Sequence, residues 1–147
     1  MPGKAFWLLC IVALILHLMC CKGYACGCAG MGEYWIHFRQ AIILGEPGKV
    51  ASMTRFPFRV GGILDSDPVL MHDRKTFPRI LARLLMQKII VVEGGNKMIE
   101  KTMLQHVQDK KSISAKDYNS PAMVTVELFD FECINGKWLF AGAYLEE

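Results

Sequence analysis

A chain of 147 residues fits one domain, because domains hold roughly 100–200 residues, and it leaves no room for a second core. Without Lys4 and Lys22, which lie in the first 28 residues, the 17 basic residues fall to 15, against 14 acidic ones. A nucleic-acid-binding domain needs a basic face to neutralise phosphates, so this near-neutral balance argues against nucleic acid as a partner.

Residues 1–28 have the pattern of an export signal. Lys4 gives a positive charge, residues 5–21 form an apolar run, and small residues recur over 23–30. This is the order of charged region, apolar region and cleavage region in a signal peptide. We therefore expect cleavage near residues 27–30 and an exported protein, either in the periplasm or anchored to a membrane and facing the periplasm.

Two other interpretations of this leader stay open. This run of 17 residues, with His17 inside it, could remain as an uncleaved anchor, although a transmembrane helix needs about 20. Alternatively, a lipid on a cysteine at the cleavage point would tether the domain to a membrane. Cys28, which follows Ala25-Cys26-Gly27, is one lipidation candidate, and Cys21, which follows Leu18-Met19-Cys20, is the other.

The six cysteines are unevenly placed. Five lie in or beside the leader, and only Cys133 lies in the domain. We therefore expect no internal disulfide and a domain that is held together by its hydrophobic core. Cys133 is expected to sit in that core as an inert thiol.

Two helices are predicted at the start of the domain. Apolar residues such as Trp35 and Phe38 recur at helical spacing over residues 33–44, and Gly45 ends that helix. Pro47 then opens a second, short helix, because proline suits a first turn where no backbone donor is needed.

A strand and a turn follow. Residues 56–60 alternate between apolar and other residues, and Pro57 restricts this strand to an edge or a bulge. Gly61-Gly62 ends the strand. Residues 65–68 have the composition of a turn, and Asp73 stands where a helix cap would.

The middle of the chain holds the clearest helical pattern. One continuous apolar face runs over residues 77–85 and predicts a helix. Residues 88–92 are rich in β-branched side chains and predict a strand. Residues 98–107 suggest another short helix or an irregular segment, and the polar residues 108–114 suggest a mobile loop.

The strongest local signal lies near the end of the chain. Asn135-Gly136 populates the left-handed conformations that a type I′ turn requires, so residues 122–134 and 137–145 should form a hairpin.

Pairing across this turn sets Cys133 opposite Trp138 and Phe131 opposite Phe140. The apolar residues earlier in this strand, at 124, 126 and 128, have even numbers, whereas Phe131 and Cys133 have odd numbers. The inward-facing positions therefore shift by one residue, which predicts a bulge near residue 128.

This order of elements predicts an α+β fold with helices on one face of a curved, mostly antiparallel sheet. With the residues that carry it, the order resembles the nuclear transport factor 2-like superfamily, also described as cystatin-like or ketosteroid-isomerase-like. The matching segments are Phe38-Arg39-Gln40-Ala41-Ile42 with Gly45-Glu46, Val50-Ala51-Ser52-Met53-Thr54-Arg55-Phe56-Pro57-Phe58, Val124-Thr125-Val126 and Asn135-Gly136-Lys137-Trp138.

The chain looks closest to uncharacterised exported bacterial members of that group. The resemblance implies one domain over residues 33–147, in which the long helix and the bent sheet enclose a conical pocket. Some members use that pocket for catalysis, and many use it only for binding or dimerisation. The fold by itself therefore does not decide the function.

The titratable residues give two catalytic candidates, His72 and Asp130. His72 lies beside Asp73 and the segment Asp65-Ser66-Asp67. This group could hold a cation or act as an acid/base pair, but a solvated turn and a helix cap are the commoner explanation. That segment lacks the third acid, the glycine and the terminal Glu of an EF-hand loop, so no metal site is predicted.

Asp130, with Glu127 and Glu132, could line the pocket or lie on the wet face of the sheet. Arg55, Arg59 and Arg79 could form an anion site or simply lie on the surface. His37 and His106 stand alone on predicted helices, where a structural role is the commoner one.

We expect a non-enzymatic domain that binds a small apolar ligand or a protein partner in the cell envelope. The sequence contains no phosphate loop, no HExxH and no nucleophile elbow, and we predict no cofactor. The alternative is an isomerase, dehydratase or hydrolase that uses a pocket carboxylate or histidine. A homodimer is compatible with either. The candidates for lining a pocket, equally expected of an ordinary core, are Trp35, Phe38, Phe56, Phe58, Phe131, Trp138 and Phe140.

Overall fold

The computed structural model describes residues 28–64 and 66–146. The expected leader therefore lies almost wholly outside the described residues. The helices are α2 (Met31–Ile43), α3 (Pro47–Ser52), α4 (Phe77–Met86), α5 (Met103–Asp109) and the short 3-10 helix η1 (Ala115–Asp117). The strands are β1 (Thr54–Gly61), β2 (Leu70–His72), β3 (Lys88–Glu93), β4 (Lys97–Thr102), β5 (Tyr118–Ser120), β6 (Met123–Val126), β7 (Phe129–Ile134) and β8 (Lys137–Tyr144).

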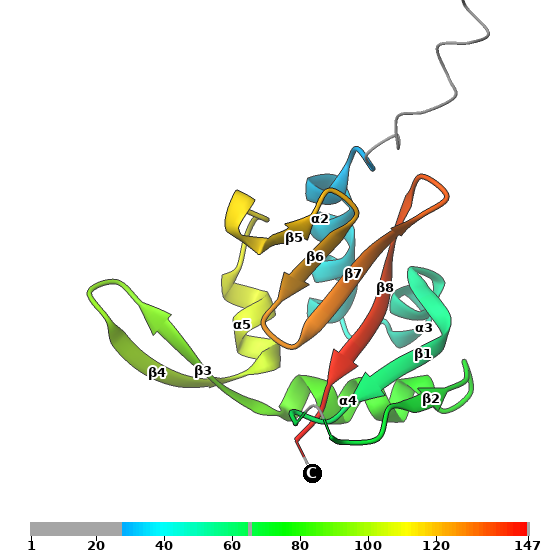
Figure 1. Ribbon diagram of the computed structural model, residues 1–147, viewed down its shortest axis with the longest axis horizontal. Helices are drawn as coiled ribbons and strands as arrows, with labels where there is room; N and C mark the ends of the chain where they lie inside the picture. Colours follow the sequence, from blue (N-terminus) through cyan, green and yellow to red (C-terminus); the bar gives the residue numbers. More distant parts are fainter. Residues whose placement is uncertain (1–27, 65, 147) are drawn as a thin grey trace, which may run out of the picture.

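Six strands form one curved sheet in the order β2-β1-β8-β7-β6-β5 (Figure 1). Its neighbours pair antiparallel except for β1 and β8, which run parallel. Strands β3 and β4 form a separate two-stranded hairpin that projects from the body of the molecule. The predicted α+β class with a mostly antiparallel, curved sheet is confirmed.

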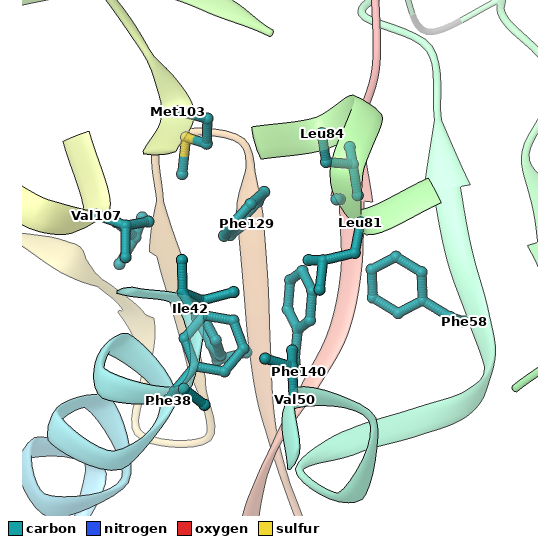
Figure 2. Packing of buried hydrophobic residues seen from close by; sticks show 14 of the residues in the cluster. Phe38, Ile42, Val50, Phe58, Leu81, Leu84, Met103, Val107, Phe129 and Phe140 are labelled. Atoms are coloured by element: carbon teal, nitrogen blue, oxygen red, sulfur yellow. The ribbon is translucent and has the colours of Figure 1, made fainter. Parts of the chain in front are cut away.

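Residues from α2, α3, α4 and α5 point into one apolar cluster with the inner face of the sheet (Figure 2). Phe38 of α2 and Phe58 of β1 both contact Phe140 of β8, with ring centroids 5.1 Å and 4.6 Å away. The largest side chains of this cluster are fully buried. Burial of so many aromatic rings supplies the main driving force for folding.

The two helices at the start are confirmed. Gly45 has a φ of 66° and ends α2 in a Schellman arrangement: the Glu46 N–H donates to the Ala41 carbonyl, and the Gly45 N–H donates to the Ile42 carbonyl. Pro47 begins α3 as expected. The glycine thus turns the chain directly from one helix into the next.

Pro57 lies inside β1, where the pairing with β8 shifts register between Thr54 and Arg59. The predicted bulge is therefore present. β1 is not an edge strand, however, because β2 pairs along its other side from Phe58 onward. Proline is tolerated there because the ladder is already interrupted at that point.

The hairpin around Asn135-Gly136 is confirmed, with φ of 51° and 77° at the two turn residues. The predicted pairs, Cys133 with Trp138 and Phe131 with Phe140, both occur.

The bulge predicted near residue 128 was wrong, because the chain reverses there. Val126 pairs with Phe129 across a tight turn at 127–128, in which Glu127 has a φ of 51°. Residues that pair directly across such a turn face the same side of the sheet, and this produces the change of parity seen in the sequence.

The prediction for residues 98–107 was partly wrong. Residues 97–102 pair with β3 as strand β4, and only then does α5 begin, with Thr102 as its cap in a capping box with Gln105. The expected loop after it is tied to α2. Arg39 donates to the Val107 and Gln108 carbonyls, and the Trp35 indole donates to the Lys110 carbonyl at 2.9 Å.

Candidate binding groove

An open groove of about 470 Å³ lies where β1, β2, α4 and the end of the chain meet. β1 ends in this groove at Gly61, because the chain leaves the sheet there and turns toward β2. The apolar walls are formed by Val60, Ile63, Leu64, Leu70, Ile80 and Leu145. Leu64 and Leu70 remain 67% and 48% exposed, so a large part of this apolar lining faces solvent. Concave apolar surfaces of this size are typical of binding sites.

The loop on one side of the groove is held by a short hydrogen-bonded turn. The Asp67 carboxylate accepts from the Leu64 N–H at 2.9 Å, and the Asp67 N–H donates to the Leu64 carbonyl at 2.9 Å. A Cβ at position 62 would collide with the Asp67 side chain, so Gly62 is needed where the loop closes. The turn holds Leu64 at the mouth of the groove.

Polar side chains are few along the groove. Asp67, His72, Arg83 and Glu146 line it together with the apolar residues. Charges of both signs are therefore present, and the apolar walls dominate its character.

A second hollow of about 510 Å³ adjoins the groove, and Ile63 and Glu146 line both. Its other walls include Ile90 at the base of the β3–β4 hairpin and Leu128 at the turn between β6 and β7. The apolar surface thus continues from the edge strand β2 toward the projecting hairpin.

The seven aromatic residues proposed as pocket lining are packed against one another. Trp35, Phe38, Phe58, Phe131 and Phe140 have no exposed surface, Trp138 is buried and Phe56 is partly buried. Phe38 and Phe131 have ring centroids 5.1 Å apart in an edge-to-face arrangement. These rings fill the inside of the fold, so they behave as the ordinary core that the sequence equally allowed.

Asp130 lies on the opposite face of the sheet from this core. It is only 2% exposed, and its Oδ1 accepts a 2.8 Å hydrogen bond from the Thr125 hydroxyl. Arg59 Nη2 lies 3.6 Å from Asp130 Oδ2 and 3.5 Å from Glu132 Oε1, and Arg55 Nη1 lies 2.8 Å from Glu132 Oε2. Both arginines are therefore neutralised by carboxylates, which does not favour an anion site.

Burial raises the pKa of Asp130 above its ordinary value of 3.8, against the opposing effects of Thr125, Arg59 and Tyr144. Desolvation disfavours the charged carboxylate, whereas hydrogen bonds and a nearby cation favour it. A raised pKa alone does not make a catalytic acid, because ion-pair networks in the sheet also perturb pKa values.

His72 lines the binding groove, and so does Asp67, whereas Asp65 lies outside the described residues. Asp73 accepts hydrogen bonds from the Thr76 N–H at 2.8 Å and from the Thr76 hydroxyl at 2.9 Å, which lowers its pKa. The predicted helix cap at Asp73 was wrong, because Thr76 is the N-cap of α4; the Asp73 carboxylate instead holds the turn that precedes the helix. His72 lines the groove, whereas Asp130 lies on the outer face of the sheet. The structure therefore does not bring the two catalytic candidates into one site.

The remaining histidines and acids lie elsewhere. His106 is partly buried, and desolvation lowers its pKa although Glu127 lies 3.9 Å away. His37 is exposed beside Glu33. Among residues 28–64 and 66–146, no three His, Cys, Asp or Glu side chains gather in a way that could hold a metal ion.

Cys133 is joined to Cys28 by a disulfide, with Cα atoms 5.8 Å apart. The expectation of an inert thiol and no internal disulfide was therefore wrong. It failed because Cys28 was assigned to the expected leader, whereas the structure places it in the fold. A sulfur in a disulfide cannot also carry a thioether-linked lipid, so this structure leaves no lipidation site at Cys28. Cys21 lies outside the described residues.

Comparison of the chain with models of protein families, with curated proteins and with solved structures gives no match in any of the three. Within the part of the chain that the structure describes, none of the helices has the length and apolar character needed to cross a membrane.

Sequence reasoning missed the groove. It assigned residues 65–68 to a turn and did not weigh the apolar side chains on either side of that turn, within residues 63–72. Five of those residues, Ile63, Leu64, Val69, Leu70 and Met71, are large, apolar and exposed. A dense apolar run in a segment with turn composition is the signal that could have pointed to a binding surface.

Proposed function

We propose that this chain is an exported, non-enzymatic domain of the nuclear transport factor 2-like group that binds a protein partner of the cell envelope in the groove beside β2. The observation that carries the proposal is an open apolar groove next to the outer edge of the sheet. The order of helices and strands supports the family assignment, and the disulfide supports export, because disulfides persist in oxidising compartments.

The edge of β2 suits an extended partner segment. β2 is the last strand of the sheet order, and Met71 on it is 61% exposed. An edge strand presents backbone donors and acceptors that an added strand can pair with, while side-chain pockets give specificity. A partner strand on β2 would place alternate apolar side chains near Leu64 and Leu70.

An enzymatic function is less well supported than partner binding. Members of this group that are enzymes use the pocket inside the cone, and here aromatic rings occupy that space. Asp130 faces the other side of the sheet, where Thr125 and Arg59 bind it. His72 is the one catalytic candidate that lines the groove. A small apolar ligand is the second possible occupant, because the groove volume falls within the range of ligand sites.

Binding of an apolar fluorescent probe tests the groove directly. Fluorescence titration with anilinonaphthalene sulfonate should show saturable binding to the purified domain. Leu64→Ser and Leu70→Ser should each weaken that binding roughly tenfold, because each removes apolar contact area. Val92→Ser, which changes an exposed apolar residue on the projecting hairpin, is the matched control. Equal effects of all three substitutions would show that the groove is not the binding site.

Cross-linking then identifies the occupant. A photoreactive side chain at Leu70, which lines the groove, introduced into the full chain in its native host, should give one discrete adduct whose yield Leu64→Ser strongly reduces. An adduct of twice the chain's mass would identify a second copy of the chain instead of another protein. The same pattern of adducts from Met98 on the hairpin would contradict a specific site at β2.

A further inference from the structure

The disulfide fastens the first described residues to the β7–β8 hairpin. Cys133 lies in β7 directly opposite Trp138 of β8. The Trp138 indole N–H donates to the Cys28 carbonyl at 3.3 Å, so the same pair of strands holds both the side chain and the backbone of Cys28. The Cα separation of 5.8 Å lies within the usual range for a disulfide.

The residues after Cys28 are equally part of the fold. Gly30 has a φ of 85°, and its carbonyl accepts from the Tyr34 N–H at 2.9 Å in the first turn of α2. Met31 is buried in the core. The folded domain therefore includes Cys28, which lies five residues before the boundary that the resemblance implied.

We infer that Cys28 stays in the mature chain, bonded to Cys133, and that any cleavage of the leader falls on the N-terminal side of Cys28. A cut after Cys28 or Ala29, which the pattern of small residues allowed, would remove the Cys28 sulfur and leave Cys133 without a partner. Lipid attachment at Cys28 is excluded for the same reason, since the sulfur forms only one further bond beyond Cβ.

The bond forms by thiol–disulfide exchange. The Cys133 thiolate attacks a disulfide of an oxidised dithiol protein or of a small-molecule oxidant and displaces one thiolate from it. The Cys28 thiolate then attacks the Cys133 sulfur in this mixed disulfide and displaces the second thiolate. Two electrons and two protons pass to the oxidant, which leaves as a dithiol if it is a protein or as two thiols if it is a small-molecule disulfide. This step rests on the export in the proposed function, because cytosolic thiols stay reduced.

Mass spectrometry of the full chain after expression in its native host tests the inference. The protein is alkylated without reductant, digested with trypsin and mapped, together with the intact mass of its N-terminus. We expect a mature chain that starts at or before Cys28. We also expect the tryptic peptide that ends at Arg39 to be linked to peptide 117–137. Reduction should separate the two peptides and make both cysteines alkylatable.

Three results would overturn the inference: a mature N-terminus at Ala29 or later, a lipid mass on Cys28, or alkylation of Cys28 and Cys133 without reduction in an exported chain. An intact leader together with reduced thiols in the cytosolic fraction would instead show that export fails. The groove is tested separately by probe binding, so the two proposals can fail independently.

Discussion

At the scale of single residues, the outer face of the sheet carries a buried carboxylate in a network of polar side chains. Asp130 is bound by Thr125 and Arg59, and Asn119 Nδ2 donates to the Thr125 hydroxyl at 2.6 Å. Gly142 lies under Arg59, where a Cβ would come within 3.1 Å of both Arg59 Nε and the Arg59 carbonyl oxygen. The network therefore depends on a small residue in the neighbouring strand.

The raised pKa of Asp130 makes a specific prediction about stability against pH. The carboxyl of Asp130 has its ordinary pKa of 3.8 in the unfolded state and a higher pKa in the native state. At pH values between the two, the native state binds more protons than the unfolded state, so the free energy of unfolding falls as pH rises. The difference in unfolding free energy between the wild type and Asp130→Asn should therefore decrease as pH rises through this range. Urea denaturation at a series of pH values measures it.

Asp73→Asn is the matched control, because hydrogen bonds from Thr76 lower the pKa of Asp73. Its contribution to stability is present above 3.8 and is lost as pH falls through the native pKa. The difference between wild type and Asp73→Asn should therefore change with pH in the opposite direction. A difference for Asp130→Asn that increases with pH would contradict the assignment.

Phe140 is the residue on which the aromatic core converges. Its ring lies within 5.3 Å of those of Phe38, Phe58, Phe129 and Phe131. Phe140→Ala should lower the free energy of unfolding by about 3–5 kcal/mol, because it removes buried apolar area and leaves a cavity. Ile90→Ala on the exposed hairpin face, where Ile90 is 67% exposed, should change it by no more than about 0.5 kcal/mol. If urea denaturation gave comparable decreases in unfolding free energy for the two variants, the aromatic cluster would not be a main source of stability.

At the scale of elements, two glycines near the first helix have opposite roles. Gly45 ends α2 with a φ of 66°, whereas Gly48 lies in α3 with helical backbone, and a Cβ at either position meets no atom within 4 Å. Because both sites have space, substitution by alanine isolates the effect of backbone conformation from that of packing.

Gly45→Ala should lower the free energy of unfolding by about 1–2 kcal/mol, because a Cβ disfavours the left-handed conformation. Gly48→Ala should raise it by about 0.5–1 kcal/mol, because alanine loses less backbone entropy in a helix. Thermal denaturation followed by circular dichroism distinguishes the two. Shifts of the same sign would contradict the assigned turn between α2 and α3.

The β3–β4 hairpin shows how an element combines two environments. Its inner face buries Ile89 and Val91, and Lys101 lies between Glu93 and Asp109 at 2.6 Å and 2.8 Å. Its outer face exposes Ile90, Val92 and Met98. A two-stranded hairpin is marginally stable alone, so contact between its inner face and the body of the domain holds it in place.

At the scale of the whole molecule, the disulfide closes a loop that spans most of the domain. It joins residues 105 positions apart, and the chain-entropy model gives such a crosslink about 4–5 kcal/mol of stabilisation. Cys133→Ser should therefore lower the free energy of unfolding by about that amount. Reductant should lower the melting temperature of the wild type but not that of Cys133→Ser. Equal sensitivity of the two proteins to reductant would contradict the pairing.

The sequence by itself determined the local elements of this protein. The apolar periodicity of α2 and α4, Pro47 at the start of α3 and Asn135-Gly136 between β7 and β8 each act through backbone conformation or one helix face. Such signals depend on neighbours close in sequence. They were sufficient for the α+β class and for the register of the last hairpin.

Only the tertiary structure decided how distant segments meet. The change of parity before Phe129 predicted a bulge, and the pairing of β6 with β7 shows that the chain makes a turn there instead. Cys28 and Cys133 lie far apart in the chain, so no local pattern could pair them. The groove likewise combines β1, β2, α4 and the end of the chain. The groove forms only where these segments pack together, and the local sequence of each segment does not predict that contact.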